Sequence, residues 1–324
     1  MKGLRIIFMG TPEFAVATLG SLLMNGFNVV AVVTVPDKPA GRGRKMSKSA
    51  VKEFAEFSNL PILQPANLKD QEFINQLQSL KPDLLVVVAF RMLPEVIWKL
   101  PPYGTINLHA SLLPDYRGAA PINHAIINGE IVTGVTTFFI NDKIDTGDII
   151  LQEEIQIYPF ENAGDLHDKL MKMGARLVIR TLSELSENRH KRIAQSEVTM
   201  PGRSFKPAPK IHPHDCIIYW NNEAEKIHNL IRGLSPYPCA RMSLRNESTV
   251  VSLKIFESRF ETSEKASDPG TIESDGRNYI KISCKNGFIN ILSLQLEGKK
   301  RMSTVEFLRG FRISDYTVVV NRQA

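Results

Sequence analysis

The chain has 324 residues, of which 43% are apolar and 23% are charged, and its formal net charge is +6. This balance is typical of a globular protein with room for two domains, and it excludes a disordered chain. No stretch approaches the roughly 18 consecutive apolar residues of a membrane span, so we expect no membrane partner. The chain has three cysteines, Cys216, Cys239 and Cys284, which lie far apart in the sequence. Their number and spacing exclude a disulfide framework and a CxxC zinc site.

The first apolar run begins at Leu4, close to the N-terminus, and it resembles the start of a secretory signal. It is short, however, and reaches Gly10-Thr11-Pro12 without a small-residue cleavage site. We therefore interpret it as a first strand and expect a cytoplasmic protein. Thr11 is expected to cap the helix that follows, with Pro12 in its first turn.

The first half of the chain alternates apolar runs with amphipathic stretches. Runs rich in β-branched residues predict buried strands over 4–9, 29–35, 84–89 and 104–108, whereas helices are expected over 12–24, 51–58 and 71–80. This alternation predicts an α/β, Rossmann-like domain with a mainly parallel sheet. Because ligands bind outside the carboxyl ends of such strands, we expect the chemistry just after Met9, Val35, Ala89 and Leu108.

The second half of the chain changes character near residue 189. Strands are expected over 135–140 and 148–157 and a long helix over 165–185, and then residues 189–214 become rich in proline and basic residues. A helix over 223–233 and several short strands follow, a pattern that suits a small OB-like β-barrel. We therefore predict a first, Rossmann-like domain over 1–188, a linker over 189–214 and a C-terminal, OB-like domain over 215–324.

Positive charge is concentrated in the C-terminal third of the sequence. Residues 1–200 contain 21 Lys/Arg and 21 Asp/Glu, whereas residues 201–324 contain 19 and 13. A basic domain next to a neutral one suggests a polyanionic partner such as a nucleic acid. An incidentally basic surface remains an alternative on charge alone.

The densest group of polar residues follows the strand that ends near residue 108. Asn107 and His109 alternate along that strand and therefore share a face, where they can stabilise charge on a carbonyl oxygen. A histidine side chain also exchanges a proton near neutral pH. Asp145 follows 36 residues after His109 and can orient its imidazole. Taken alone, the pair can equally be a buried, purely structural one, and the Asp-Thr-Gly-Asp sequence can be a plain turn.

Three motifs occur in order and resemble the formyltransferase family that uses 10-formyltetrahydrofolate. They are Asn-x-His at 107–109, Ser-Leu-Leu-Pro-x-x-Arg-Gly at 111–118 and Asp-x-Gly at 145–147. The resemblance implies that Asn107, His109 and Asp145 carry the reaction without a metal. It also implies that the folate is bound by Ser111, Leu112, Leu113, Pro114, Phe90, Arg91, Met92, Leu93, Asn141 and Asp142.

Four further segments match one branch of that family: residues 8–14, 118–122, 231–238 and 292–300. In these segments the chain resembles the branch that formylates initiator methionyl-tRNA. The resemblance implies that the domain over 1–188 is catalytic and that the domain over 215–324 binds tRNA. A loop over 38–48 holds five basic residues and no acidic one, and it should emerge beside the site. The resemblance implies tRNA contact by Lys38, Arg42, Arg44, Lys45 and Lys48, with Arg42 at the acceptor end, although an exposed loop with incidental charge would look the same. We expect a monomer.

Other functions are less consistent with the sequence. Gly41-Arg42-Gly43 is neither a dinucleotide fingerprint nor a phosphate-binding loop, which argues against a nicotinamide-dependent oxidoreductase. An RNA-binding protein without activity would leave Asn107, His109 and Asp145 unexplained. A formyltransferase for an amino sugar or for glycinamide ribonucleotide would not need the basic C-terminal region. His212 and His214 lie in the expected linker and are interpreted as surface residues.

Overall fold

The computed structural model describes residues 3–40, 45–198, 204–263 and 267–320. The chain divides into two compact units, each of which gathers separate segments of the sequence. The first unit consists of Met1–Pro121, Thr133–Ile155 and His167–Ala208. The second consists of Ile122–Val132, Gln156–Leu166 and Pro209–Ala324.

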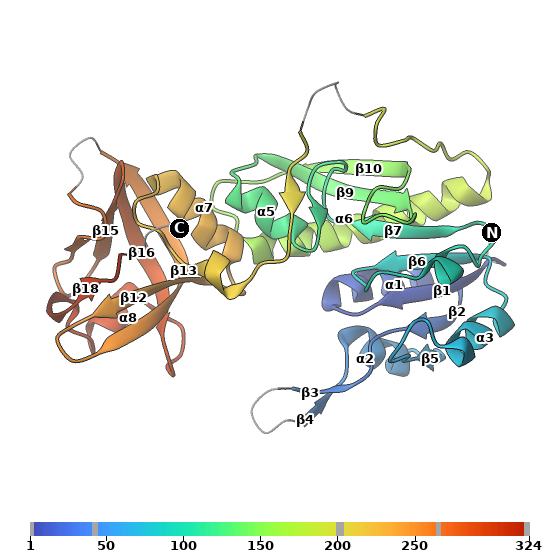
Figure 1. The fold of residues 1–324 in the computed structure, drawn as a ribbon, viewed down its shortest axis with the longest axis horizontal. Helices are drawn as coiled ribbons and strands as arrows, with labels where there is room; N and C mark the ends of the chain where they lie inside the picture. Colours follow the sequence, from blue (N-terminus) through green and yellow to red (C-terminus); the bar gives the residue numbers. More distant parts are fainter. Residues whose placement is uncertain (1–2, 41–44, 199–203, 264–266, 321–324) are drawn as a thin grey trace. The chain divides into compact units, whose positions relative to one another are not determined.

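The main sheet of the first unit has seven strands in the order β10-β9-β7-β6-β1-β2-β5 (Figure 1). Strand β1 pairs in parallel with β2 and β6, β2 with β5, and β6 with β7, whereas β9 pairs with β7 in the antiparallel sense. The α/β, mainly parallel fold expected from the sequence is thus confirmed. The strands are β1 (Arg5–Gly10), β2 (Asn28–Val33), β5 (Ile62–Leu63), β6 (Leu84–Val88), β7 (Thr105–His109), β9 (Val132–Phe139) and β10 (Ile149–Gln156).

The strands of this sheet are buried on both sides, because helices cover both of its faces (Figure 1). Ile7 and Leu85 of the sheet belong to one apolar cluster with Phe73 and Leu77 of α3. Helix α1 contacts β1, β2 and β6 and also packs on α2. The helices are α1 (Glu13–Met24), α2 (Ala50–Phe57), α3 (Gln71–Ser79), α4 (Glu95–Trp98), α5 (Pro121–Ile127) and α6 (Ala163–Ser186).

The ends of these helices agree only partly with the caps expected from the sequence. Ser49 and Asp70 accept hydrogen bonds from backbone N–H groups in the first turns of α2 and α3, as serine and aspartate caps do. The expected cap at Thr11 is wrong: the N-cap of α1 is Pro12, which makes no side-chain cap bond. The helix therefore begins one residue later than the Thr-Pro signal suggests.

Short strands that the sequence did not indicate form two further pairs in the first unit. Strands β3 (Lys38–Ala40) and β4 (Lys45–Ser47) make an antiparallel hairpin within the basic loop. Strands β8 (Arg117–Gly118) and β11 (Pro207–Ala208) pair in parallel. Strand β11 lies inside the segment expected as a linker, and residues up to Ala208 are part of the first unit. The domain boundaries at 188 and 214 stay a prediction.

The second unit contains a nearly closed antiparallel β-barrel, as the sequence predicted. Its strand order is β14-β15-β16-β13-β12-β18, with β17 paired to β16, and helix α7 packs on β13, β16 and β12. Trp220 lies fully buried in its core. The elements are η1 (Pro213–Cys216), α7 (Ala224–Leu234), β12 (Ala240–Arg245), β13 (Val250–Thr262), β14 (Ile272–Glu273), β15 (Ile280–Cys284), β16 (Gly287–Leu296), β17 (Met302–Ser303), α8 (Thr304–Leu308), η2 (Ile313–Asp315) and β18 (Thr317–Val318).

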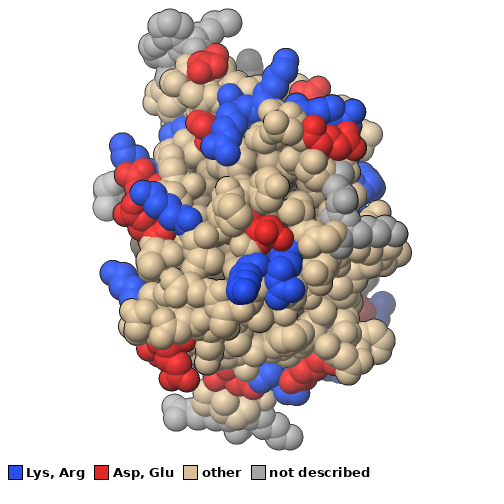
Figure 2. Space-filling model, turned by 90° about the vertical axis from the view of Figure 1, so that its right-hand side faces the viewer, with Lys and Arg blue, Asp and Glu red and all other residues tan. Residues whose placement is uncertain are grey.

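The excess of basic residues lies after residue 200 in the sequence, but the two compact units divide this charge differently. The second unit includes three acidic residues from earlier segments and holds 17 Lys/Arg against 16 Asp/Glu, whereas the first holds 23 against 18. Figure 2 shows a face on which cations and carboxylates are interspersed. The net positive charge therefore belongs mainly to the first unit. In the described part of the chain, no helix combines the length and apolar composition needed to cross a membrane.

Candidate active site

The candidate site lies at the carboxyl end of β7, which is the edge where the sequence predicted it. His109 is the last residue of the strand, is 6% exposed and stands opposite Thr136 of β9. Asn107 is half-buried and stands opposite Phe138. The alternation of the strand thus places both side chains on one face, because successive residues point to opposite sides.

The two ring nitrogens of His109 have different surroundings. Nε2 lies 2.8 Å from the carbonyl oxygen of Tyr116, and a carbonyl oxygen can only accept, so Nε2 carries a proton and donates. Nδ1 lies 3.7 Å from Oδ2 of Asp145, which is too long for a hydrogen bond but close enough for an ion pair. Nδ1 is therefore the nitrogen that faces the carboxylate of Asp145.

Asp145 is held in a strained turn by backbone contacts. Its φ is +53°, a left-handed conformation that aspartate adopts more readily than most residues. Its Oδ2 accepts a hydrogen bond of 2.9 Å from the N–H of Gly118. A Cβ atom at Gly147 would lie 1.6 Å from the carbonyl oxygen of Phe139, so only glycine fits there. The Asp-x-Gly motif is therefore a turn that β9 and β8 hold in place.

Two further residues adjoin this turn: Arg117, which lies in the 111–118 motif but to which the sequence assigned no role, and Gln195, which sequence reasoning missed. Gln195 is 4% exposed, and its amide bridges Arg117 to the backbone of the Asp145 turn. Burial lowers the pKa of the Arg117 guanidinium, and the nearby Asp145 opposes that shift. No sequence signal marked Gln195, because it lies 50 residues from Asp145 in a segment without clear periodicity.

The predicted folate-binding stretch forms a tightly bonded loop after β7. The Ser111 hydroxyl donates 2.7 Å to the carbonyl of Asp115, so this buried side chain is used within the loop. Thr136 and Gln152 bond the backbone of the loop at Ser111 and Leu113. Leu112 is half-exposed, whereas Leu113 and Pro114 are buried. The backbone and Leu112, rather than the Ser111 side chain, are thus the parts open to a ligand.

The loop after β6 and the segment after β9 approach one another. Phe90, Leu93 and Ile140 all pack in one apolar cluster of the first unit. The Arg91 guanidinium donates to the carbonyls of Pro65 and Ala66, so it braces the loop rather than pointing freely. Met92 is exposed.

Asn141 and Asp142 follow directly after Ile140 and differ in their contacts. The Asn141 Oδ1 accepts from the Lys143 N–H at 3.1 Å and from the Thr146 hydroxyl at 2.9 Å, while Asp142 is exposed. Asn141 thus shapes the turn that leads to Asp145. Asp142 remains open to a ligand.

The basic hairpin is tied to the first unit at its base. The Lys52 ammonium lies 2.6 Å from Asp37, and Gln64 donates to Asp37 at 2.9 Å, which together lower the pKa of Asp37. Lys38 is exposed, and Lys48 lies 2.6 Å from the carboxylate of Glu56. Lys48 is thus already paired with an anion. Arg42, Arg44 and the Lys45 side chain lie outside the described residues.

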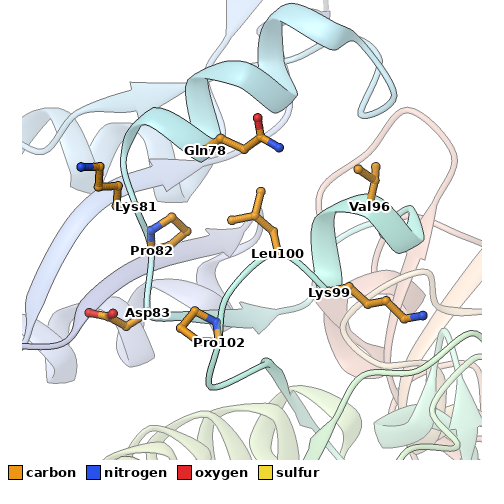
Figure 3. Close-up of a pocket in the computed structure, with 8 residues that line it drawn as sticks. All are labelled: Gln78, Lys81, Pro82, Asp83, Val96, Lys99, Leu100 and Pro102. Carbon is orange, nitrogen blue, oxygen red and sulfur yellow. The ribbon is translucent and has the colours of Figure 1, made fainter.

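Two hollows of the structure lie elsewhere. One of about 630 Å³ lies at the amino end of β6, where Lys81, Asp83, Val96, Lys99 and Leu100 surround it (Figure 3). Another of about 300 Å³ lies on the barrel between Arg241, Lys254 and Gln295. Among the residues that the structure describes, no group of three or more His, Cys, Asp or Glu side chains can hold a metal ion.

Comparisons with known proteins identify the family. Residues 4–182 match the model "Formyl transferase", and residues 210–312 match "Formyl transferase, C-terminal domain". The chain is 52% identical to methionyl-tRNA formyltransferase of Bacteroides fragilis over 97% of each chain. It is 53% identical to the same enzyme of Flavobacterium johnsoniae, over 97% of this chain and 98% of the relative.

A solved structure supports the same fold. The sugar 3N-formyl transferase WlaRD, crystallised with dTDP and 5-N-formyl-THF, has a TM-score of 0.63 and 23% identity, over 92% of this chain and 99% of that one. Identity at this level shows the fold alone. Together with the family models and the relatives at about 50% identity, it leads to one conclusion: the chain belongs to the formyl transferase family.

Proposed function

We propose that this chain transfers the formyl group of 10-formyltetrahydrofolate to the α-amine of methionine on initiator methionyl-tRNA. The single observation that carries the proposal is the group of Asn107, His109 and Asp145 at one sheet edge, in a chain about half identical to methionyl-tRNA formyltransferases along nearly its whole length. The reaction forms a nitrogen–carbon bond at the amine and breaks the bond between the formyl carbon and N10 of the folate. One amine proton leaves, and N10 gains one.

The residues at this edge fit a reduced folate in their chemistry. The side-chain amide of Asn107 is half-buried and carries both hydrogen-bond donors and an acceptor for a ligand. Phe90, Leu93 and Ile140 supply apolar walls of the kind that a flat pterin ring needs. The buried Nε of Arg91, which has no partner within the structure, lies in the same loop.

When bound, the folate supplies an electrophilic formyl carbon. The side chains of this enzyme stabilise the charge that develops and help to move the proton. The attacking amine must be neutral, and the formyl oxygen gains negative charge as the new bond forms. Asn107 donates a hydrogen bond to that oxygen, and the cationic form of His109 stabilises it. Asp145, at 3.7 Å from Nδ1, favours that cationic form and helps to remove the amine proton, directly or through a water molecule.

The tRNA acceptor is assigned to the basic hairpin and to the second unit. In this proposal, Lys38, Arg44, Lys45 and Lys48 attract phosphates, and Arg42 reads the acceptor end with its planar fork of donors. The excess charge of the first unit, with 23 basic against 18 acidic residues, supports a share of the attraction near the site itself. We further propose that the enzyme acts as a monomer in the cytoplasm.

The proposal is tested by a transfer assay with 10-formyltetrahydrofolate and two acceptors, initiator and elongator methionyl-tRNA. Release of tetrahydrofolate and formation of formylmethionine are measured together. We expect turnover with both products in equal amounts and a higher kcat/KM for the initiator tRNA. Formylation of an amino sugar but of neither tRNA would contradict the assigned acceptor.

A further inference from the structure

Gln195 lies in the segment expected as a linker, yet it is among the most completely bonded side chains near the site. Its Oε1 accepts from the Nε of Arg117 at 3.0 Å and also from an Nη of the same guanidinium. Its Nε2 donates to the carbonyl oxygens of Asp145 and Gly147, each at 2.9 Å. Because a guanidinium can only donate, Arg117 determines which end of the amide faces the turn.

These bonds close a ring around Asp145. Arg117 orients Gln195, Gln195 holds the backbone of Asp145, and the Asp145 carboxylate accepts from the N–H of Gly118, the residue next to Arg117. The left-handed φ of Asp145 is a conformation that surrounding contacts must maintain. The ring supplies these contacts on both the backbone and the side chain.

The segment that carries Gln195 is itself anchored to the first unit. Ile193 exchanges two backbone hydrogen bonds with Ile149, the first residue of β10, at 2.8 and 3.0 Å. Its side chain packs on a small core formed by Leu113, Phe138 and Ile149. These contacts hold the backbone near Gln195 in place, so that its side chain can restrain the Asp145 turn.

We propose that Gln195 is a positioning residue for formyl transfer, which keeps the Asp145 carboxylate beside His109. The inference rests on the proposed function. It assigns to Gln195 no contact with the substrate: its effect reaches the reaction only through Asp145. Displacing a catalytic group by about 1 Å can lower turnover by about 100-fold.

Gln195→Glu separates the two ends of the amide. It keeps the length of the side chain and an acceptor for Arg117, but it turns a negative oxygen toward the carbonyl oxygens of Asp145 and Gly147. We expect kcat to fall by about 10- to 100-fold, with the KM for the folate changed much less. Should Gln195→Glu fail to fold, the uncharged Gln195→Met removes the same donors and serves for the same measurements.

A double-mutant cycle shows whether Gln195 acts through Asp145. In an Asp145→Asn background, single-turnover rates should change by less than about twofold on adding Gln195→Glu, because the group it positions is already impaired. Gln152→Glu is a matched control, since the Gln152 amide donates to the carbonyl of Leu113 in the neighbouring loop and to the hydroxyl of Thr136 in β9. The fold-decrease in single-turnover rate that Gln152→Glu causes should be as large in the Asp145→Asn background as in the wild type.

A second readout does not depend on activity. Hydrogen exchange of the Gly118 amide reports its bond to Asp145, and we expect Gln195→Glu to speed it while Gln152→Glu leaves it unchanged. Additive losses in the cycle, or unchanged kcat and Gly118 exchange in a folded variant, would overturn the inference. A wild-type chain without formyl transfer would overturn the proposed function first, and the role of Gln195 in transfer with it.

Discussion

Two histidines, one in each unit, are buried to nearly the same degree but differ in their neighbours. His109 is 6% exposed and His228 is 7% exposed. His109 ends a strand beside the carboxylate of Asp145, whereas His228 lies on α7, bonded to the Ser258 hydroxyl at 3.0 Å and close to the cation of Arg232. Burial and then Arg232 lower the pKa of His228 to about 4, although the imidazole also donates a hydrogen bond to the backbone carbonyl of Pro159, which acts in the opposite direction.

The difference shows that burial alone does not make a histidine useful for chemistry. His109 lies beside a carboxylate at the carboxyl end of β7, the edge of a parallel sheet where ligands bind. A neighbouring cation and a packed helix keep His228 neutral at physiological pH, so we interpret it as structural. The predictions below test this contrast, from the largest expected effect to the smallest.

The largest effect is expected for the three polar residues at the sheet edge. Asn107→Ala, His109→Ala and Asp145→Ala should each lower kcat by about 1,000-fold, because each removes charge stabilisation or proton handling in the transition state. Folate affinity, measured by fluorescence titration, should change by only a few-fold. His228→Gln is the control and should retain turnover at pH 7. A fall in kcat as large as that of His109→Ala would contradict the structural role that we assign to His228.

The next largest effect concerns the glycine of the Asp-x-Gly turn. Gly147→Ala places a Cβ atom against the backbone of Phe139 and must displace the turn that carries Asp145. We expect kcat to fall by about 100-fold together with a lower melting temperature. Gly310→Ala is the control, because a Cβ atom there meets nothing within 4 Å. A Gly147→Ala enzyme with normal kcat would show that the turn tolerates displacement.

The pH dependence of stability should reveal His228. Above pH 6.5 it is neutral in both states; between pH 6.5 and about 4 the unfolded chain binds a proton that the folded chain excludes. The free energy of unfolding of the second unit should therefore fall by up to about 3 kcal/mol as the pH drops through this window. Urea unfolding followed by fluorescence of Trp220 in a Trp98→Phe background measures it, and His228→Gln should flatten that part of the curve.

The smallest effects are expected at the hairpin. Arg42→Ala should lower the preference for initiator over elongator tRNA by about tenfold, as loss of a bidentate contact does. Lys38→Ala, an exposed cation, should weaken both tRNAs alike and reduce the salt slope by about one unit. Measuring kcat/KM for both tRNAs distinguishes the two. Equal losses on both tRNAs with Arg42→Ala would mean that the hairpin contributes only charge.

Several features of the fold were predictable because they depend on local patterns. The β-branched runs indicated β1, β2, β6 and β7 to within two residues at each end, and the alternation of strands and helices indicated a parallel sheet. Strand alternation alone placed Asn107 and His109 on one face. The short strands β8, β11, β14 and β18 escaped prediction, since pairs of two residues carry no periodic signal.

What the sequence by itself determined, then, was whatever repeats over a few residues: the strands, the helices, the edge of the sheet and the polar residues along it. Only the tertiary structure decided which distant segments meet. Gln195 reaches Arg117 across 78 positions. Residues 122–132 and 156–166 belong to the second compact unit, and their acidic residues bring its net charge close to zero. Such contacts depend on the path of the chain through space, and neither spacing nor composition records that path.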